Sequence, residues 1–255
     1  MRLRSPLLSV ASSLLLAACS RASSDALPTA AAPPPTPTTA AATAAAPATP
    51  PTVTVTAAEM PFEQYQAPGD DALAWVGFYY AVAGTPVDYP AIAARLDPTF
   101  RATTDAFAQR DAVAGVKTKL DAAIAAAKAN PYVKLSPVVT RMPAYDLAQS
   151  RYDLSAFIGP DLRIHIGAGV ADVAFSPNAS LAAYAPANEA EARALEHNIS
   201  SNPLGRQIQF TVYGKVVAGS LHGGEPQLTI IPSRVVVENY LLGQPPQLLF
   251  TASVP

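Results

Sequence analysis

The feature that most constrains this chain is a long tract built from only three residue types. Every residue from 28 to 52 is proline, threonine or alanine. Such a tract buries too little apolar surface to offset the conformational entropy lost on folding, so we expect disorder. Proline-rich chains extend by roughly 3.1 Å per residue, so a tether over residues 20–58 spans on the order of 100 Å. A bare spacer and a glycosylated threonine-rich stalk are both consistent with this composition.

The charge balance of the chain excludes one class of function. The 255 residues contain 17 Lys and Arg against 19 Asp and Glu, and the formal net charge is −2. Nucleic-acid-binding domains are expected to carry a clustered basic surface, and the sequence has no basic cluster, so we predict no nucleic-acid partner. No apolar stretch reaches the ~20 residues that a membrane-spanning helix needs.

The first residues have the order of a secretory signal. Arg2 and Arg4 precede a mostly apolar run at residues 7–16, and two small residues, Ala17 and Ala18, follow it. A basic region, an apolar region and small residues in this order are typical of a segment that is cleaved during export. We therefore predict a signal peptide over residues 1–18.

The only cysteine of the chain, Cys19, comes directly after this segment. The sequence Leu16-Ala17-Ala18-Cys19 resembles the lipobox of bacterial lipoproteins. The resemblance implies a diacylglycerol on the Cys19 thiol, cleavage after Ala18 and acylation of the new amino group. Two or more acyl chains are needed for stable anchoring, which this modification supplies. The alternative is an ordinary signal peptide with an incidental cysteine.

The residue after the cysteine indicates where the anchor resides. Ser20 is not the aspartate that typically retains Gram-negative lipoproteins at the inner membrane, so the resemblance implies the outer membrane. The expected partner is the membrane itself, through the acyl chains on Cys19, with an envelope protein or the cell wall as a further possibility. The domain is expected to face the periplasm, and display on the cell surface is the alternative. With Cys19 acylated, no disulfide is available to stabilise the fold.

Downstream of the tether we expect a single α+β domain over residues 59–255. Its first part, residues 59–130, is predicted to be helical. Helices are expected from a cap at Asp70 or Asp71 to Ala83, at residues 91–96, and at residues 104–129, where apolar residues recur at three- and four-residue spacing. The aromatic stripe of the first helix (Trp75, Phe78, Tyr79 and Tyr80) is interpreted as core, with a ligand platform as the alternative.

The second part, residues 131–255, is predicted to be rich in strands. Period-two alternation or β-rich composition predicts strands at residues 132–142, 162–166, 170–175, 206–217, 227–231, 234–239 and 247–251. A short helix is also expected, at residues 189–197. Residues 220–224 are read as a hairpin loop. One apolar and one polar face in the strand at 206–217 favour an antiparallel sheet. Helices followed by strands indicate an α+β fold with N-terminal helices and a mostly antiparallel sheet.

The sequence contains no motif that carries a known catalytic mechanism. The nucleophile elbow, the zinc-protease helix motif, the phosphate-binding loop and the EF-hand loop are all missing. The histidines His165, His197 and His222 are scattered, and no set of residues suggests a metal site. We therefore predict no catalytic residue, no metal and no cofactor.

Four residues nevertheless remain as candidates for a surface site. His165 is expected in a strand and His222 in a turn, where functional residues concentrate. Asp146 and Asp153 occur in Tyr-Asp-Leu triplets seven residues apart. These aspartates are interpreted either as a repeated turn, in which the side chain accepts from the backbone, or as a carboxylate pair for acid–base chemistry.

The domain also shows a resemblance beyond the lipobox. The residues that carry it are Tyr79-Tyr80-Ala81, Gly84, Pro86-Val87-Asp88-Tyr89, Asp105, Phe107, Arg110, Tyr145-Asp146-Leu147 and Phe157. Together they resemble a family of uncharacterised bacterial secreted or lipid-anchored proteins, which has no assigned activity. The sequence thus favours a lipid-anchored binding or structural module of the envelope. The alternative is an envelope hydrolase whose site is assembled from residues distant in sequence.

Overall fold

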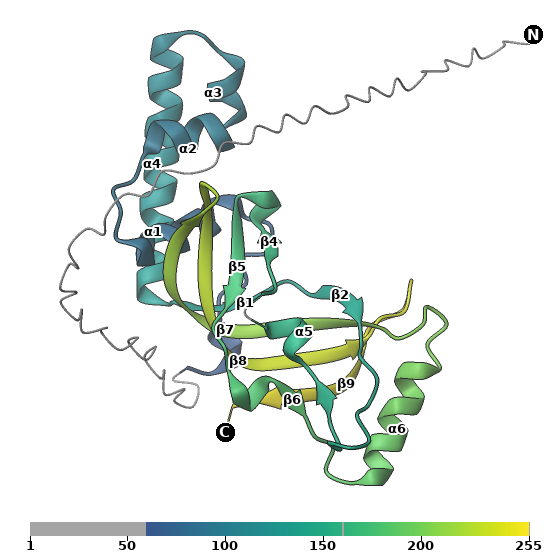
Figure 1. Cartoon of the computed structure of the whole chain (residues 1–255). Helices are drawn as coiled ribbons and strands as arrows, with labels where there is room; N and C mark the ends of the chain where they lie inside the picture. The colour runs from purple at the N-terminus through teal and green to yellow at the C-terminus, as the bar shows by residue number, and fades with distance from the viewer. Residues whose placement is uncertain (1–59, 160, 255) are drawn as a thin grey trace, which may run out of the picture. The chain divides into compact units, whose positions relative to one another are not determined.

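The structure analysed is a computed structural model, and it describes residues 60–159 and 161–254 (Figure 1). The predicted signal segment, the lipobox residues Leu16, Ala17, Ala18 and Cys19, and the tether lie outside the described residues. The described part contains helices and a mostly antiparallel sheet, with the helices first, which confirms the predicted α+β class.

The helical part comprises a 3-10 turn and four helices. Their bounds are η1 Phe62–Gln64, α1 Ala72–Ala83, α2 Tyr89–Leu96, α3 Pro98–Ala102 and α4 Ala106–Ala129. An aspartate caps each α-helix by accepting backbone N–H groups: Asp71 for α1, Asp88 for α2, Asp97 for α3 and Asp105 for α4. Helix α1 ends at Gly84, whose φ of 66° is the left-handed conformation that glycine adopts without strain.

Helices α1 and α4 pack at very close range. A Cβ atom added to Gly77 of α1 would lie 2.7 Å from the Cβ of Ala123 in α4, so only glycine permits this approach. Trp75, Phe78 and Tyr79 of α1 are buried, which confirms the core interpretation for these three members of the aromatic stripe. Tyr80, the fourth member, is only half-buried.

One mixed sheet organises the strand-rich part. Its strands are β1 Tyr132–Lys134, β2 Val138–Arg141, β4 Ile164–Ile166, β5 Ala171–Phe175, β7 Gln207–His222, β8 Glu225–Asn239 and β9 Gln247–Ser253. The two long strands β7 and β8 pair along their whole length, with β1 and β2 on the outer side of β7. On the outer side of β8, β5 pairs in parallel at one end and β9 antiparallel at the other.

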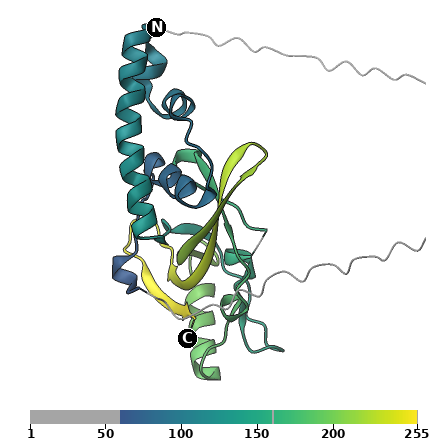
Figure 2. The same ribbon diagram turned by 90° about the vertical axis from the view of Figure 1, so that its left-hand side faces the viewer.

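Different elements cover the core face at the two ends of this sheet (Figures 1 and 2). Helix α1 lies over the end that carries β5, because Gly219 of β7 leaves room for Tyr79 and Ala83. At the β9 end, Phe157 of α5 (Ser155–Ile158) stacks on Phe210 at a centroid distance of 5.1 Å. The small β3–β6 sheet (Tyr152–Asp153 and Ala183–Tyr184) packs there on Phe250, and α6 (Glu189–Ser200) follows it.

The structure corrects the predicted hairpin. The loop expected at residues 220–224 is only a two-residue turn, Gly223–Gly224, and Ser220 to His222 belong to β7. Both glycines have positive φ, 61° and 89°, as in the tight turns whose twist matches that of paired strands. The strands expected at 227–231 and 234–239 are one strand, β8, which continues through Pro232 and Ser233 with an irregular register.

The predicted alternation in β7 is confirmed, with one exception. Ile208, Phe210, Val212 and Val216 are buried, and Gln207, Gln209, Thr211, Tyr213 and Lys215 lie on the other face. Thr211 belongs to the polar face by its position, but it is also buried.

Candidate functional site

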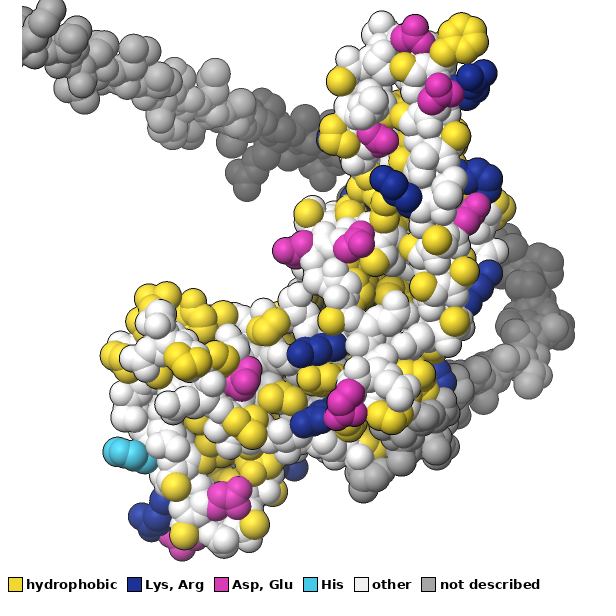
Figure 3. Space-filling model, turned by 180° about the vertical axis from the view of Figure 1, so that it is seen from behind, with side chains coloured by type: hydrophobic (Ala, Val, Ile, Leu, Met, Phe, Trp, Pro, Cys, Tyr) yellow, Lys and Arg dark blue, Asp and Glu magenta, His cyan; other side chains and the backbone are white. Residues whose placement is uncertain are grey.

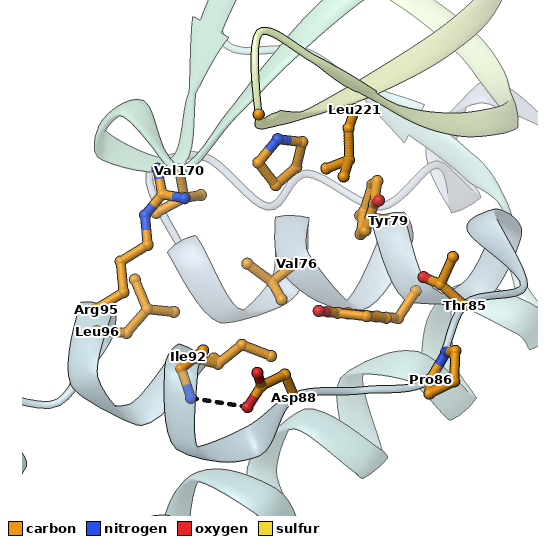
Figure 4. Close-up of a pocket in the computed structure, with 14 residues that line it drawn as sticks. Val76, Tyr79, Thr85, Pro86, Asp88, Ile92, Arg95, Leu96, Val170 and Leu221 are labelled. Carbon is orange, nitrogen blue, oxygen red and sulfur yellow. Dashed lines mark hydrogen bonds between the residues drawn. The ribbon is translucent and has the colours of Figure 1, made fainter.

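A pocket of about 490 Å³ lies between α1, α2 and the glycine-turn end of the β7–β8 hairpin (Figure 4). Its walls are mainly apolar and come from four separate parts of the chain: Val76, Ile92, Leu96, Val170, Leu221 and Pro226. Pockets of this volume with apolar walls and a few convergent polar groups are typical of small-molecule sites. We therefore take this pocket, called the helix–hairpin pocket below, as the candidate site.

The local sequence explains why the pocket forms here. Gly84 ends α1, and Asp88 begins α2 after a short connection, so the two helices pass close together with Tyr80 and Asp88 on the same side. The long β7–β8 hairpin extends beyond the rest of the sheet and brings Leu221 over this junction. Figure 4 shows Leu221 and Asp88 on opposite sides of the pocket.

Two polar groups belong to the pocket on its helical side. Burial is the main reason why the pKa of Tyr80 is raised, and the nearby Tyr79 and Asp88 side chains add to the rise, while a hydrogen bond with the Asp88 backbone opposes it. Tyr80 is therefore a neutral hydroxyl at physiological pH and can donate a hydrogen bond. Asp88 uses Oδ1 to accept from the Ala91 N–H at 3.0 Å, and among the described residues its Oδ2 has no partner.

A third polar group, Arg95, closes one end of the pocket and already has partners. Its Nη2 donates to the Gly169 carbonyl at 3.1 Å and lies 2.8 Å from Oε2 of Glu225. These contacts connect α2 to the hairpin. Because both side chains are substantially exposed, the ion pair contributes little to stability. Its main effect on the pocket is to compensate the positive charge of Arg95 with Glu225.

The four residues that the sequence proposed as surface candidates lie outside the helix–hairpin pocket. His222 is the last residue of β7, and Glu225 is its neighbour in the strand register across the turn. Asp146 and Asp153 both line another pocket of about 220 Å³, together with Arg151. This pocket contains neither His165 nor His222, and the pocket that His165 lines contains neither aspartate.

The turn interpretation of the two aspartates is confirmed. Asp146 Oδ1 accepts from the backbone N–H groups of Ala148 and Gln149 at 2.8 and 3.0 Å. Asp153 Oδ1 accepts from the Ser155 N–H at 2.8 Å. A hydrogen bond with the Ser155 side chain is the largest cause of the lowered pKa of Asp153, and the bond with the Ser155 backbone adds to it. Both carboxylates therefore stabilise local turns, and a low pKa makes Asp153 a poor proton donor at neutral pH.

His165 has a partner that the sequence did not reveal. Its Nδ1 lies 2.5 Å from Oδ1 of Asp172, its cross-strand neighbour in β5. The strand register continues this row through Gln227 of β8 to Ser220 of β7. Strands are spaced by about 4.8 Å, so the serine is roughly 14 Å from the histidine, and the row cannot act as a hydrolytic triad.

Sequence reasoning therefore missed most residues of the pocket. In the sequence, Asp88 carries only the family resemblance, and Tyr80 belongs to the aromatic stripe that is interpreted as core, with a ligand platform as the alternative. The one available signal was that Tyr80 follows three aromatic residues that already fill the inward side of a helix. Leu221 gave no signal, because its place at the pocket follows from the length of a hairpin that the sequence divided into pieces.

Comparisons of the chain with protein-family models, curated proteins and solved structures find no match. None of the helices in the described part is long and apolar enough to cross a membrane. Within residues 60–159 and 161–254, no three His, Cys, Asp or Glu side chains are grouped so that they could hold a metal ion.

Proposed function

We propose that this chain is a lipid-anchored outer-membrane protein whose domain faces the periplasm and binds a small, mainly apolar ligand in the helix–hairpin pocket. The lipobox-like sequence before Cys19 and the proline-rich tract support the anchor and the tether. The pocket supports the binding role, because it combines apolar walls with a small number of polar groups.

The charges at the pocket indicate the chemical class of the ligand. Arg95 is compensated by Glu225, whereas one oxygen of Asp88 has no partner among the described residues. The Tyr80 hydroxyl is neutral and adds a hydrogen-bonding group without a charge. An apolar molecule that carries an ammonium group satisfies these features, because its cation pairs with Asp88 while its body contacts Ile92 and Leu221.

A ligand series with one alkyl chain and three head groups tests this binding mode. The protein used begins at Ser20, which retains every residue of the hydrophobic core. Octylamine, octanol and octanoate are titrated separately and followed by NMR chemical shifts. We expect the amine to bind about tenfold more tightly than the alcohol, and octanoate to bind least, because Asp88 attracts a cation and repels a carboxylate.

Two matched variants assign the head-group preference to Asp88. Asp88→Asn removes the charge and keeps a residue that caps helices well, so α2 should remain intact. Asp105→Asn makes the same change at the cap of α4, away from the pocket. The preference for octylamine should disappear in the first variant and persist in the second. Equal affinities for all three ligands in the unaltered protein contradict the proposal.

The anchor is tested separately from the pocket. Cells that express the full chain are labelled with radioactive palmitate, and the protein is compared with its Cys19→Ala variant. We expect label in the unaltered protein and none in the variant, because Cys19 is the only thiol. Label retained by the variant contradicts lipidation at Cys19 and leaves the pocket proposal unaffected.

A further inference from the structure

The sheet face opposite the core carries an unequal distribution of charge. Every lysine and arginine within β1, β2, β7 and β8 lies on this face: Lys134, Arg141, Lys215 and Arg234. The only acidic residue of these strands on the same face is Glu238, because Glu225 lies at the distant turn and pairs with Arg95. We call the four cations the basic face. It is opposite in sign to the whole chain, whose formal charge is −2.

Aromatic rings hold part of the basic face in place. Lys134, Tyr213 and Arg234 form one cross-strand row. The Lys134 ammonium lies 5.7 Å from the centre of the Tyr213 ring, and the Arg234 guanidinium lies 5.5 Å from the same centre. Arg234 also lies 4.8 Å from the ring of Phe62. Contacts of this kind fix Lys134 and Arg234 on the sheet surface without neutralising their charge.

An exposed apolar group adjoins the basic face at its β9 end. The strand register places Val139 and Leu248 in one row, with Gln209 and Glu238 between them. Val139 is 46% exposed and Leu248 is 64% exposed, and Leu242 in the β8–β9 loop is 70% exposed. We call these three residues the apolar end. Figure 3 shows hydrophobic side chains gathered at one edge of the domain, and basic side chains with acidic ones beside them along its middle.

The first described residues of the chain lie on this surface. Phe62, near the start of the described residues, packs against Tyr213 with ring centroids 5.5 Å apart, so the chain enters the domain on the basic face. The tether and Cys19 precede this point in the sequence. If Cys19 is acylated, the lipid surface lies at the other end of the segment that enters here. This directional step rests on the proposed anchor, whereas the charge and apolar exposure do not.

We infer that the basic face and the apolar end dock on an anionic phospholipid surface. Arg141 is exposed, and Lys134, Lys215 and Arg234 are half-buried. These cations attract phosphate head groups, and each one that comes close to such a surface is expected to strengthen binding roughly fivefold. The apolar end supplies side chains that enter the boundary between head groups and acyl chains. Docking of this kind restricts the domain to the membrane surface in addition to the lipid tether.

Co-sedimentation with lipid vesicles tests the inference without an acyl anchor. The protein that begins at Ser20 lacks Cys19 and retains the whole core. It is mixed with vesicles of phosphatidylglycerol and, separately, of phosphatidylcholine. We expect binding to the anionic vesicles that weakens as salt is added, and far less binding to the zwitterionic vesicles. Equal binding to both lipids, or binding to neither, overturns the inference.

Matched variants locate the contact on this surface. Lys134→Gln combined with Arg141→Gln removes two cations of the basic face and should weaken binding to phosphatidylglycerol by more than tenfold. Lys119→Gln combined with Arg101→Gln removes two exposed cations on helices and should change it little. Leu242→Asn with Leu248→Asn should also weaken binding, whereas Leu147→Asn, at a residue 85% exposed elsewhere, should not.

The same variants separate a lipid surface from a second copy of the chain. Light scattering measures the mass of the protein without vesicles. A dimer that Leu248→Asn dissociates, together with a failure to bind anionic vesicles, contradicts the inference and assigns the surface to self-association. The inference is also contradicted if the control variants lose as much vesicle binding as the variants of the basic face and the apolar end. The palmitate experiment does not bear on any of these outcomes, because the sedimented protein carries no acyl chain.

Discussion

At the scale of single residues, Glu196 and Arg206 show how a polar contact holds the strand-rich part together. Arg206 pairs with Glu196 through Nη1 and donates from Nη2 to the Pro143 carbonyl at 2.6 Å. Tyr152 donates its hydroxyl to Oε2 of Glu196 at 3.1 Å. The hydrogen bond from Arg206 is the largest cause of a lowered pKa at Glu196, and burial opposes it. Burial is also the main cause of the raised pKa of Tyr152.

This contact predicts a dependence of stability on pH. Because the pKa of Glu196 is lower in the folded state, the ionised carboxylate stabilises the fold above the unfolded-state pKa. That contribution is lost as pH falls through the folded-state pKa. Glu196→Gln should lower the free energy of unfolding by about 2 kcal/mol at neutral pH and by much less in acid. Urea denaturation across the acidic range measures this difference, and a loss that is independent of pH contradicts the assignment.

Alanine substitutions at two glycines are predicted to change the free energy of unfolding in opposite directions. Gly77→Ala should lower the free energy of unfolding by about 1–3 kcal/mol, because the new Cβ meets the Ala123 backbone and forces α1 and α4 apart. Gly115→Ala in α4 meets nothing within 4 Å, so it should raise this free energy by up to about 1 kcal/mol. Thermal denaturation measures the stability of both variants. If both substitutions destabilise the protein, the close approach of α1 and α4 at Gly77 does not explain the effect of Gly77→Ala.

At this scale the sequence predicted local bonding well and tertiary partners poorly. The capping role of Asp71 and the turn roles of Asp146 and Asp153 depend on residues within a few positions along the chain. The pairing of His165 with Asp172 depends on the register between two strands. Register is set by the burial of whole strand faces, so the partner could not be read from either residue alone.

At the scale of elements, the β7–β8 hairpin decides whether the pocket exists. The sequence indicated most of its residues as strands but divided them at Pro232 and at the glycines. Proline usually interrupts a ladder, but β8 continues past Pro232 through a shift in register near Gly214 and Ser233. Gly223 and Gly224 form only the two-residue turn between β7 and β8. The parallel pairing of β5 with β8 also escaped prediction, because it joins segments that are distant in the chain.

The turn of this hairpin gives a prediction for the element. Gly223 has a φ of 61°, so Gly223→Val places a β-branched residue in the left-handed region, at a cost of roughly 1–2 kcal/mol. We expect faster amide hydrogen exchange in residues 217–228 and weaker octylamine binding, because Leu221 then loses its fixed position. Exchange in β9 serves as the internal reference. Unchanged exchange at the hairpin with intact binding contradicts the role assigned to this turn.

At the scale of the whole molecule, the order of segments was readable from composition and periodicity. Helices before strands correctly predicted the α+β class. The helix–hairpin pocket was not predictable, because its walls come from α1, α2, the residue after η2 (Gly167–Gly169) and the end of the hairpin. A pocket of this kind requires the packing of segments that no local pattern relates.

The most direct measurement of ligand binding in the pocket uses intermolecular nuclear Overhauser effects. The protein that begins at Ser20 is labelled at its isoleucine, leucine and valine methyl groups and saturated with octylamine. We predict contacts from the alkyl chain to Val76, Ile92 and Leu221, which come from three elements that line this pocket. Contacts that are confined to Val139, Leu242 and Leu248, or the absence of any specific contact, would contradict the proposed function.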